Sequence, residues 1–156
     1  MPKKKTIAKD IPLAEITLRR YEKPNNLGER ELIRKLCLSL GLLQPGDSRD
    51  VIVDVLGVLI KAKREQKNLT SEDICKSVIE ERKNQKLVML GIASSNIRRQ
   101  LKRLKDIMLV EKRLNAYRIT EESSLVQIFE EKIEKYLLTN INSRIKEYLE
   151  RVDKVN

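Results

Sequence analysis

Histidine and tryptophan are absent from this sequence of 156 residues. The absence of histidine removes the commonest general base and the commonest metal ligand of proteins. The two cysteines, Cys37 and Cys75, lie far apart within apolar helical patterns, and we expect buried thiols there rather than a zinc site. The sequence also contains no glycine-rich phosphate-binding loop and no recognisable pair of catalytic carboxylates. We therefore expect no enzyme activity, no catalytic residues, no metal and no cofactor.

Aromatic residues are scarce as well, at 3% of the chain. The core must therefore be built from leucine, isoleucine and valine, and a stacking platform for single-stranded nucleic acid is poorly supported. No apolar run approaches the roughly 18 residues of a membrane-spanning helix, and no signal peptide is visible. We expect a cytoplasmic protein with no membrane partner. The abundance of lysine, glutamate, isoleucine and leucine is compatible with a thermophilic source.

Positive charge is what the sequence has in excess, with a net charge of +10 that favours polyanionic partners. The distribution of this charge is uneven. Residues 1–9 contribute +4 and residues 98–118 contribute +6, whereas residues 10–97 contribute +2 and residues 119–156 contribute −2. The excess is therefore concentrated in an N-terminal tail and in one internal segment.

Hydrophobic periodicity predicts a mainly helical chain that carries one small β-hairpin. Apolar residues recur at spacings of three and four in four segments, as they do in helices that face a core. These helices are expected at residues 29–43, 48–67, 71–82 and 95–105. Two short strands are expected to follow at 109–113 and 116–120, joined at Leu114 and Asn115.

Capping residues mark the expected starts of two of these helices. Thr70 and Asp73 have the spacing of a capping box, and Ser94 or Ser95 is placed to cap the fourth helix. Residues 83–93 lie between the third and fourth helices and contain the apolar run Leu-Val-Met-Leu, so they are not a solvated loop. They either extend the third helix or add another turn.

Residues 94–120, SSNIRRQLKRLKDIMLVEKRLNAYRIT, read as a helix with one apolar and one basic side, followed by a basic hairpin. This segment resembles the pattern Ser-x-x-hydrophobic-x-Arg-x-Leu-x-x-Leu-x-x-x-x-Leu-Val-x-Arg of bacterial and archaeal transcription regulators related to the MarR and ArsR families. The preceding LTSEDICKSVI, residues 69–79, resembles the helix before it in those proteins. The resemblance implies a winged helix-turn-helix DNA-binding domain at residues 27–120, which includes an extra N-terminal helix.

Two features depart from the pattern of these regulators. Met108 stands where they usually have a glycine after the recognition helix. Roughly a dozen residues separate the third and fourth helices, whereas simple helix-turn-helix proteins use a turn of roughly 3–4 residues. The sequence therefore does not determine the docking angle of the recognition helix on a duplex.

By this resemblance, the helix from Ser95 would lie in the major groove of double-stranded DNA. The residues implied for base contacts are Ser95, Asn96, Arg98 and Arg99. Those implied for phosphate contacts are Lys102, Arg103 and Lys105, and those of the wing are Lys112, Arg113, Asn115 and Arg118. The chain would be a sequence-specific transcription regulator, associated with the nucleoid when bound, with no small-molecule effector indicated. The alternative is a winged-helix protein-interaction module in a replication, transcription or RNA-processing complex.

The two ends of the chain flank this domain. Residues 1–26 form a basic arm, in which Lys3, Lys4 and Lys5 are either a solvated tail or a phosphate-binding arm. Residues 121–156 form a long amphipathic helix, with a break or kink indicated at the poor helix formers 139–143. Its apolar stripe is expected to join two copies in a homodimer, or else to fold back on its own domain. The residues expected to dimerise are Phe129, Ile133, Tyr136, Leu137, Ile141, Ile145 and Leu149.

Overall fold

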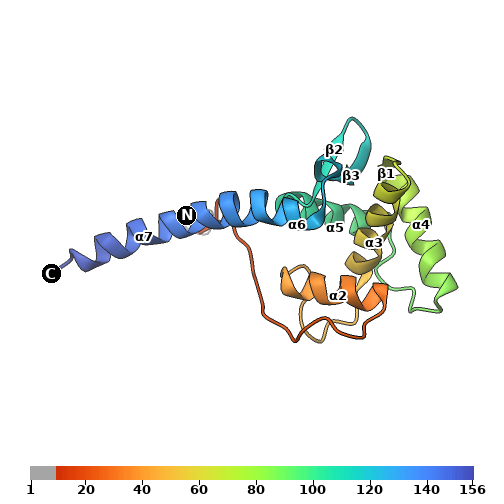
Figure 1. Ribbon diagram of the computed structural model, residues 1–156, viewed down its shortest axis with the longest axis horizontal. Coiled ribbons are helices and arrows are strands. Elements are labelled where there is room, and N and C mark those ends of the chain that lie inside the picture. The colour runs from red at the N-terminus through yellow and green to blue at the C-terminus, as the bar shows by residue number, and fades with distance from the viewer. Residues whose placement is uncertain (1–9) are drawn as a thin grey trace, which may run out of the picture.

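The computed structural model describes residues 10–156, and the predicted roles of Lys3, Lys4 and Lys5 lie outside the described residues. The chain is mainly helical, with a small domain from which one long helix projects (Figure 1). The domain helices are α2 (Glu29–Ser39), α3 (Val51–Arg64), α4 (Ser71–Asn84) and α5 (Ser94–Asp106). The strands are β1 (Leu69–Thr70), β2 (Val110–Arg113) and β3 (Ala116–Ile119). A 3-10 turn (Thr120–Glu122) precedes the long helix, which comprises α6 (Leu125–Ile128), the π-helical segment η2 (Phe129–Leu138) and α7 (Thr139–Asp153).

The three strands form an antiparallel sheet in the order β1-β3-β2. The predicted hairpin is confirmed, with Arg113 paired to Ala116 across a two-residue turn. The sequence did not indicate β1, a strand of two residues in which Leu69 pairs with Tyr117. Because β1 directly precedes α4, this pairing attaches the start of α4 to the hairpin. The predicted capping box of Thr70 and Asp73 is confirmed at the same place.

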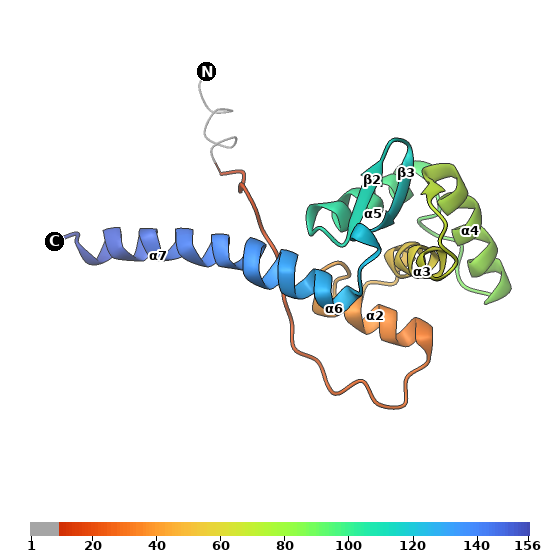
Figure 2. The same cartoon turned by 45° about the horizontal axis from the view of Figure 1, so that its top comes forward.

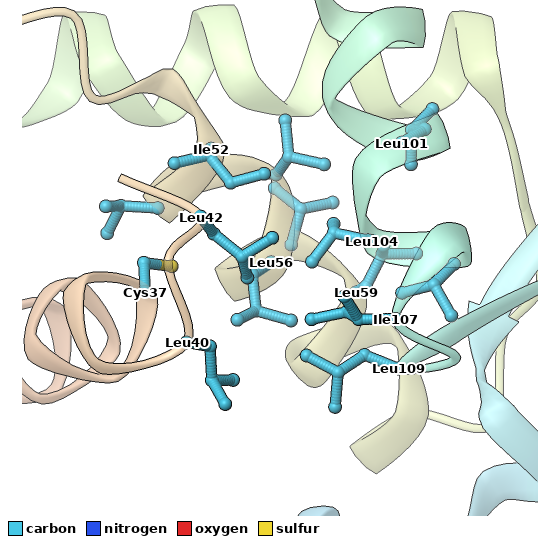
Figure 3. Packing of buried hydrophobic residues seen from close by; sticks show 14 of the residues in the cluster. Cys37, Leu40, Leu42, Ile52, Leu56, Leu59, Leu101, Leu104, Ile107 and Leu109 are labelled. Carbon is cyan, nitrogen blue, oxygen red and sulfur yellow. The ribbon is translucent and has the colours of Figure 1, made fainter. Parts of the chain in front are cut away.

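Helix α3 lies at the centre of the core and packs against α2, α4, α5 and β3. Nine of its 14 residues are buried, because neighbouring elements cover most of its circumference. Figure 3 shows Leu56 and Leu59 of α3 close to Leu104 of α5. As the composition predicted, the buried apolar residues are mostly leucine, isoleucine and valine.

The two thiols differ in their surroundings. Cys37 is fully buried in the core, which confirms the prediction for this residue. Cys75 is only half-buried, because it lies beside rather than on the face of α4 that carries the buried Ile74 and Val78. Burial raises the pKa of Cys37 to about 12, since the uncharged thiol is favoured away from water.

Four helices end in the same hydrogen-bonded turn, in which a residue with left-handed backbone follows the last helical turn. After α2 this residue is Gly41, at φ +70°, and the amide of Leu42 donates to the carbonyl of Cys37 at 2.8 Å. The turn ends α2 at Ser39, before the predicted end at residue 43. A Cβ at Gly41 would lie 2.6 Å from atoms of Thr17, so the position requires glycine. After α3, α4 and α5 the corresponding residues are Gln66, Lys86 and Met108.

Residues 10–26 follow an extended path that leads to α2 (Figure 1). The segment is attached to the domain, because the backbone amide of Arg19 donates to the carbonyl of Ser39 at 2.8 Å. The Arg19 guanidinium also donates to the carbonyl of Leu38 at 3.0 Å. Ile16 and Tyr21 pack against the core. Residues 16–21 of the predicted arm are therefore fixed on the domain, whereas Ile11 and Leu13 are exposed.

Residues Leu125 to Asp153 form one uninterrupted helix (Figure 2). The predicted break at residues 139–143 is wrong, because the backbone at Leu138 is helical (φ −67°, ψ −40°) and α7 continues directly from it. The irregularity lies upstream, where η2 has π-helical hydrogen bonding. The low helix propensity of residues 139–143 is therefore outweighed by the helical segments on both sides.

Candidate nucleic-acid interface

Helix α5 is held in the domain by its apolar face. Ile97, Leu101 and Leu104 are fully buried, and the helix packs against α3 and α4. Their spacing predicted this burial. The opposite face of α5 is left to solvent, and the segment of highest positive charge is therefore presented on a rigidly packed helix.

The start of α5 differs from the prediction. The helix begins at Ser94 with Ala93 as its N-cap residue, and no side chain caps it. A capping residue must lie one position before the helix, whereas both Ser94 and Ser95 are already helical. Neither serine therefore has the predicted capping role.

The outward face of α5 is basic. The predicted contact residues exposed on it are Ser95, Arg98, Arg99, Lys102 and Lys105. Lys102 forms an ion pair with Asp106 at 3.1 Å, one helical turn away, and this pair offsets part of its charge. Within residues 10–156, no ion pair joins Arg98, Arg99 or Lys105 to a carboxylate. The guanidinium of Arg99 donates a long hydrogen bond of 3.5 Å to the side-chain oxygen of Asn96, at an exposed site. All three cations are exposed and could therefore contact a ligand.

Two of the predicted contact residues are engaged within the domain instead. The side-chain nitrogen of Asn96 donates to the carbonyl of Gly91 at 2.7 Å. Arg103 is half-buried and donates to the side-chain oxygen of Gln100 at 2.8 Å and to the carbonyl of Gly41 at 3.3 Å. Both side chains position α5 on the domain, and they are less available to a ligand than the sequence predicted.

The hairpin extends the basic surface beyond α5. In both views β2 and β3 project beside α5, on the side of the domain away from α2 (Figures 1 and 2). Lys112, Arg113 and Asn115 are exposed near the tip. The Lys112 ammonium lies 5.6 Å from the centre of the Tyr117 ring, close enough for a cation–π contact. Three of the four predicted wing residues therefore face solvent.

Arg118, the fourth, is neutralised within the hairpin. Its guanidinium donates to Glu111 at 2.6 Å and to Glu122 at 3.0 Å, and Glu111 lies directly opposite it in the strand register. Desolvation would raise the pKa of Glu111, but hydrogen bonds from the Glu121 amide and from Arg118 outweigh it and lower the pKa below its ordinary value. Arg118 thus stabilises the hairpin and is not a free cation at its surface.

An ionic cluster that the sequence did not indicate joins helices α2, α3 and α4. Arg82 of α4 is 2% exposed, and its guanidinium donates to Asp54 at 2.5 Å and to Asp50 at 3.1 Å. Arg30 of α2 lies 3.1 Å from the same Asp54 carboxylate. The Arg82 Nε also donates to the carbonyl of Val88 at 2.9 Å. The cluster therefore fixes the connection between α4 and α5 as well as the helices.

The predicted extension of the third helix is confirmed only for residues 83 and 84, and residues 85–93 form a non-helical connection. Helix α4 ends at Asn84, and the chain is non-helical until Ser94. Instead of helical hydrogen bonds, the side chains of Arg82 and Asn96 satisfy two of its carbonyls. The long connection between α4 and α5 is therefore held in place by these two side chains.

A signal for the buried arginine was present in the sequence. Arg82 follows Ile74 and Val78 at intervals of four, and residues at this interval share one face of a helix. An arginine on a core-facing row needs a buried acidic partner. The sequence pattern could therefore have indicated the cluster, although not which carboxylates complete it.

The residues predicted to dimerise divide into two groups along the long helix. Those that are buried or half-buried against the chain itself are Phe129, Ile133, Leu137 and Ile141. Those that are exposed are Tyr136, Ile145 and Leu149. The first group packs where the helix leaves the domain, and the second lies mostly on its projecting part.

The surface of α5 and the hairpin offers guanidinium, ammonium and amide groups, which bind anions and base edges. Across residues 10–156 there is no cluster of three or more histidine, cysteine, aspartate or glutamate residues placed to hold a metal ion. None of the helices in this range has the length and apolar character needed to cross a membrane. No protein family model, no curated protein and no solved structure matches this chain.

Proposed function

We propose that this protein binds double-stranded DNA through the exposed basic face of α5 and the tip of the β2–β3 hairpin. One observation carries the proposal: Arg98, Arg99 and Lys105 are exposed and free of carboxylate partners in residues 10–156, on a helix whose other face is buried. An α-helix fits the major groove of B-form DNA. Cationic side chains along such a helix raise the affinity of the protein for DNA, because each phosphate that they contact releases its bound counterions.

The order of elements supports a winged helix-turn-helix domain. Helix α3, strand β1, helices α4 and α5 and the β2–β3 hairpin follow one another as they do in that fold, with β1 completing the sheet. In this assignment α5 is the recognition helix and the hairpin is the wing. The long connection at 85–93 separates the two helices of the motif at a fixed distance, since Arg82 and Asn96 anchor it.

Fewer residues are proposed to contact DNA than the sequence alone predicted. Arg98 and Arg99 are the residues for base contacts, since arginine binds guanine with two hydrogen bonds. Lys102 and Lys105 contact phosphates, which position the protein without reading sequence. The wing contributes Lys112, Arg113 and Asn115. Asn96, Arg103 and Arg118 act through the domain, because their side chains already have partners there.

As a transcription regulator, the protein would act as a homodimer. Two recognition helices on one face of the duplex read half-sites about one helical turn apart. The exposed apolar stripe on the projecting part of the long helix is the surface that would join the copies. Dimerisation and DNA contact thus use separate parts of the chain.

A gel-shift titration with duplex DNA tests the proposal. The variant Arg98→Ala, Arg99→Ala, Lys105→Ala should lose at least about tenfold in affinity, since each lost base contact costs about 1–3 kcal/mol. The matched control Lys61→Ala, Lys83→Ala, Lys86→Ala removes the same charge from α3, α4 and the turn after α4, and should bind nearly as wild type. Equal affinity of the wild type and the α5 variant would overturn the proposal.

The alternative of a protein-interaction module is favoured by one observation. Val88 and Leu90, in the connection before α5, are 64% and 47% exposed although the segment is anchored. Exposed apolar side chains held in a fixed conformation are typical of protein-binding surfaces. Duplex affinity that does not depend on Arg98, Arg99 and Lys105 would favour this alternative over DNA binding.

A further inference from the structure

The apolar stripe of α7 continues a row that is buried at its start. Ile133, Leu137, Ile141, Ile145 and Leu149 follow one another at intervals of four along one helix. Ile133 is 0% and Leu137 is 6% exposed, whereas Ile145 and Leu149 are 51% and 56% exposed. In Figure 2 the end of α7 projects away from the rest of the domain. The domain therefore covers the apolar row in the first half of the helix, and the same row continues uncovered on the projecting half.

An apolar groove lies at the base of the same helix. Its volume is about 430 Å³, and it opens between the helix and the adjacent part of the domain. Leu18, Leu36 and Leu40 line it on the domain side, and Val126 and Phe129 line it on the helix side. Val126 is 68% exposed and Leu18 is 41% exposed. The groove therefore presents apolar side chains to solvent next to the start of the long helix.

The charges at the two ends of the helix are complementary. Glu130 and Glu134 line the groove, are exposed, and form no ion pair within residues 10–156. Arg144 and Arg151 are exposed on α7, beside the apolar stripe. Arg144 is paired only with Glu147 of its own helix, at a site where both side chains are more than half exposed. The base of the helix is thus acidic where the groove lies, and the tip carries arginines next to its apolar residues.

We propose that a second copy of this chain occupies the groove, with the two long helices antiparallel and the α7 stripe of each copy against the groove of the other. This arrangement deepens the dimer of the proposed function and rests on it. A two-fold interface is self-complementary, because each contact occurs twice. The same sequence must therefore supply both the apolar tip and the apolar groove, and this chain has both.

The residue positions along the helix agree with this pairing. With the two-fold axis near residue 139, Val152 of one copy lies level with Val126 of the other, and Leu149 lies level with Phe129. The same axis brings Arg144 level with Glu134. It also brings Lys146 level with Lys132, whose charge is offset by an ion pair with Glu121 of its own chain at 3.2 Å. Apolar residues therefore meet apolar residues, and the unpaired carboxylate of the groove meets a guanidinium.

A parallel pairing of the same helices matches neither feature. It would place Glu134 beside Glu134 and Arg144 beside Arg144, and like charges across an interface are unfavourable. It would also leave the apolar groove exposed to water at the base of both helices. The antiparallel arrangement therefore accounts for the groove, the stripe and the unpaired carboxylate of Glu134 together.

Cross-linking between single cysteines distinguishes the two pairings. The background protein is the 156-residue chain with the substitution Cys75→Ser. Val126→Cys is introduced into one sample of this background and Val152→Cys into another. A short bifunctional thiol reagent is used for cross-linking, because it tolerates small differences in register. The buried Cys37 remains as in the natural sequence. We expect covalent dimers when the two variants are mixed, and few when either is treated alone. Efficient cross-linking of the Val152→Cys variant alone, or none in the mixture, would overturn the proposal.

A charge exchange tests the same contact by sedimentation equilibrium. Glu134→Arg should raise the dimer dissociation constant about tenfold or more, because it sets two guanidinium groups against each other. Adding Arg144→Glu should restore most of the affinity, and Glu31→Arg on α2 should leave it unchanged. Protein that remains monomeric at all concentrations would overturn the pairing. Since these measurements contain no DNA, a monomer that still binds duplex through α5 would leave the DNA-binding proposal standing.

Discussion

The side chain of Asn96 donates a hydrogen bond of 2.7 Å to the backbone carbonyl of Gly91, and this contact ties the first turn of α5 to the connection before it. The amide oxygen of the same side chain accepts a hydrogen bond from Gln100 at 3.1 Å. A residue that the sequence offers as a reader of adenine is therefore occupied within the domain. Under the proposed function, Asn96 would act on DNA by positioning Arg98 and Arg99, which follow it on the helix.

We expect Asn96→Ala to lower the free energy of unfolding by about 1 kcal/mol, since it removes side-chain hydrogen bonds at a partly buried site. Duplex affinity should fall by a similar factor for all sequences, because the position of α5 changes and base contacts do not. Urea unfolding and binding to a panel of duplexes measure the two effects. An altered preference at one base pair with unchanged stability would show that Asn96 reads DNA directly.

Arg82→Ala should lower the free energy of unfolding by about 3–5 kcal/mol, because it leaves the buried Asp54 carboxylate without its closest partner. The double variant Arg82→Met, Asp54→Leu should recover a large part of this loss, since apolar residues often replace buried ion pairs well. Lys83→Ala, at the next and exposed position, is the control and should change stability by less than about 0.5 kcal/mol. Chemical denaturation checks all three. A small loss for Arg82→Ala alone would mean that the cluster does not stabilise the fold.

Met108→Gly should stabilise the protein by about 1 kcal/mol, because Met108 has left-handed backbone (φ 65°) that costs a residue with a Cβ about 1–2 kcal/mol. The turn itself will be kept, since the amide of Leu109 donates to the carbonyl of Leu104 at 3.1 Å without help from the side chain. Met108→Ala removes the same side-chain contacts without relieving the backbone, and should not stabilise. Thermal unfolding of the two variants separates these effects, and equal melting temperatures would contradict the account.

Stability should fall in acid partly through Glu111. Its pKa is lowered in the folded protein, so its contribution is complete above the unfolded value of about 4.3 and is lost as the pH falls through the folded pKa. Glu111→Gln removes this contribution at neutral pH. The difference in melting temperature between wild type and Glu111→Gln should therefore shrink as the pH is lowered below about 4. A difference that stays constant over this range would show that the Arg118 pair has no linked effect.

The two thiols should react at very different rates. The pKa of Cys37 is about 12 and its side chain is fully buried. Partial burial also raises the pKa of Cys75, but Arg98 opposes this shift and the side chain is only half-buried. A thiol-specific alkylating agent at mildly alkaline pH should therefore modify Cys75 in the folded protein and Cys37 only after unfolding. Peptide mass spectrometry follows both sites in one sample. Modification of both at one rate would contradict the burial of Cys37.

The elements that carry the interface could be predicted from sequence because their periodicity is strong. Ile97, Leu101 and Leu104 define the buried face of α5 by spacing alone, and the hairpin follows from two short strands and a turn. The strand β1 could not be predicted, since two residues carry no periodicity. Its pairing is decided by β3, more than 40 residues later in the chain.

The availability of the site residues could not be predicted, because it depends on partners distant in sequence. Arg103 is bonded to Gly41, 62 residues away, and Arg82 is bonded to Asp54, 28 residues away. Residue type indicates that an arginine can donate hydrogen bonds, but only the fold decides to which group. The end of α2 was misplaced by four residues although Gly41 marks its turn, whereas the ends of α3, α4 and α5 lie within three residues of the prediction. The left-handed positions after those three helices are Gln66, Lys86 and Met108, where glycine is the usual signal.

The salt dependence of duplex binding tests the central claim most directly. If α5 lies against the phosphates, the logarithm of the association constant should fall linearly with the logarithm of salt concentration, with a slope of about −0.9 per phosphate contact. Lys102→Ala and Lys105→Ala should each make the slope shallower by about 1, whereas Lys83→Ala and Lys86→Ala should not change it. A slope that is the same in all four variants, or no duplex binding at low salt, would contradict the account.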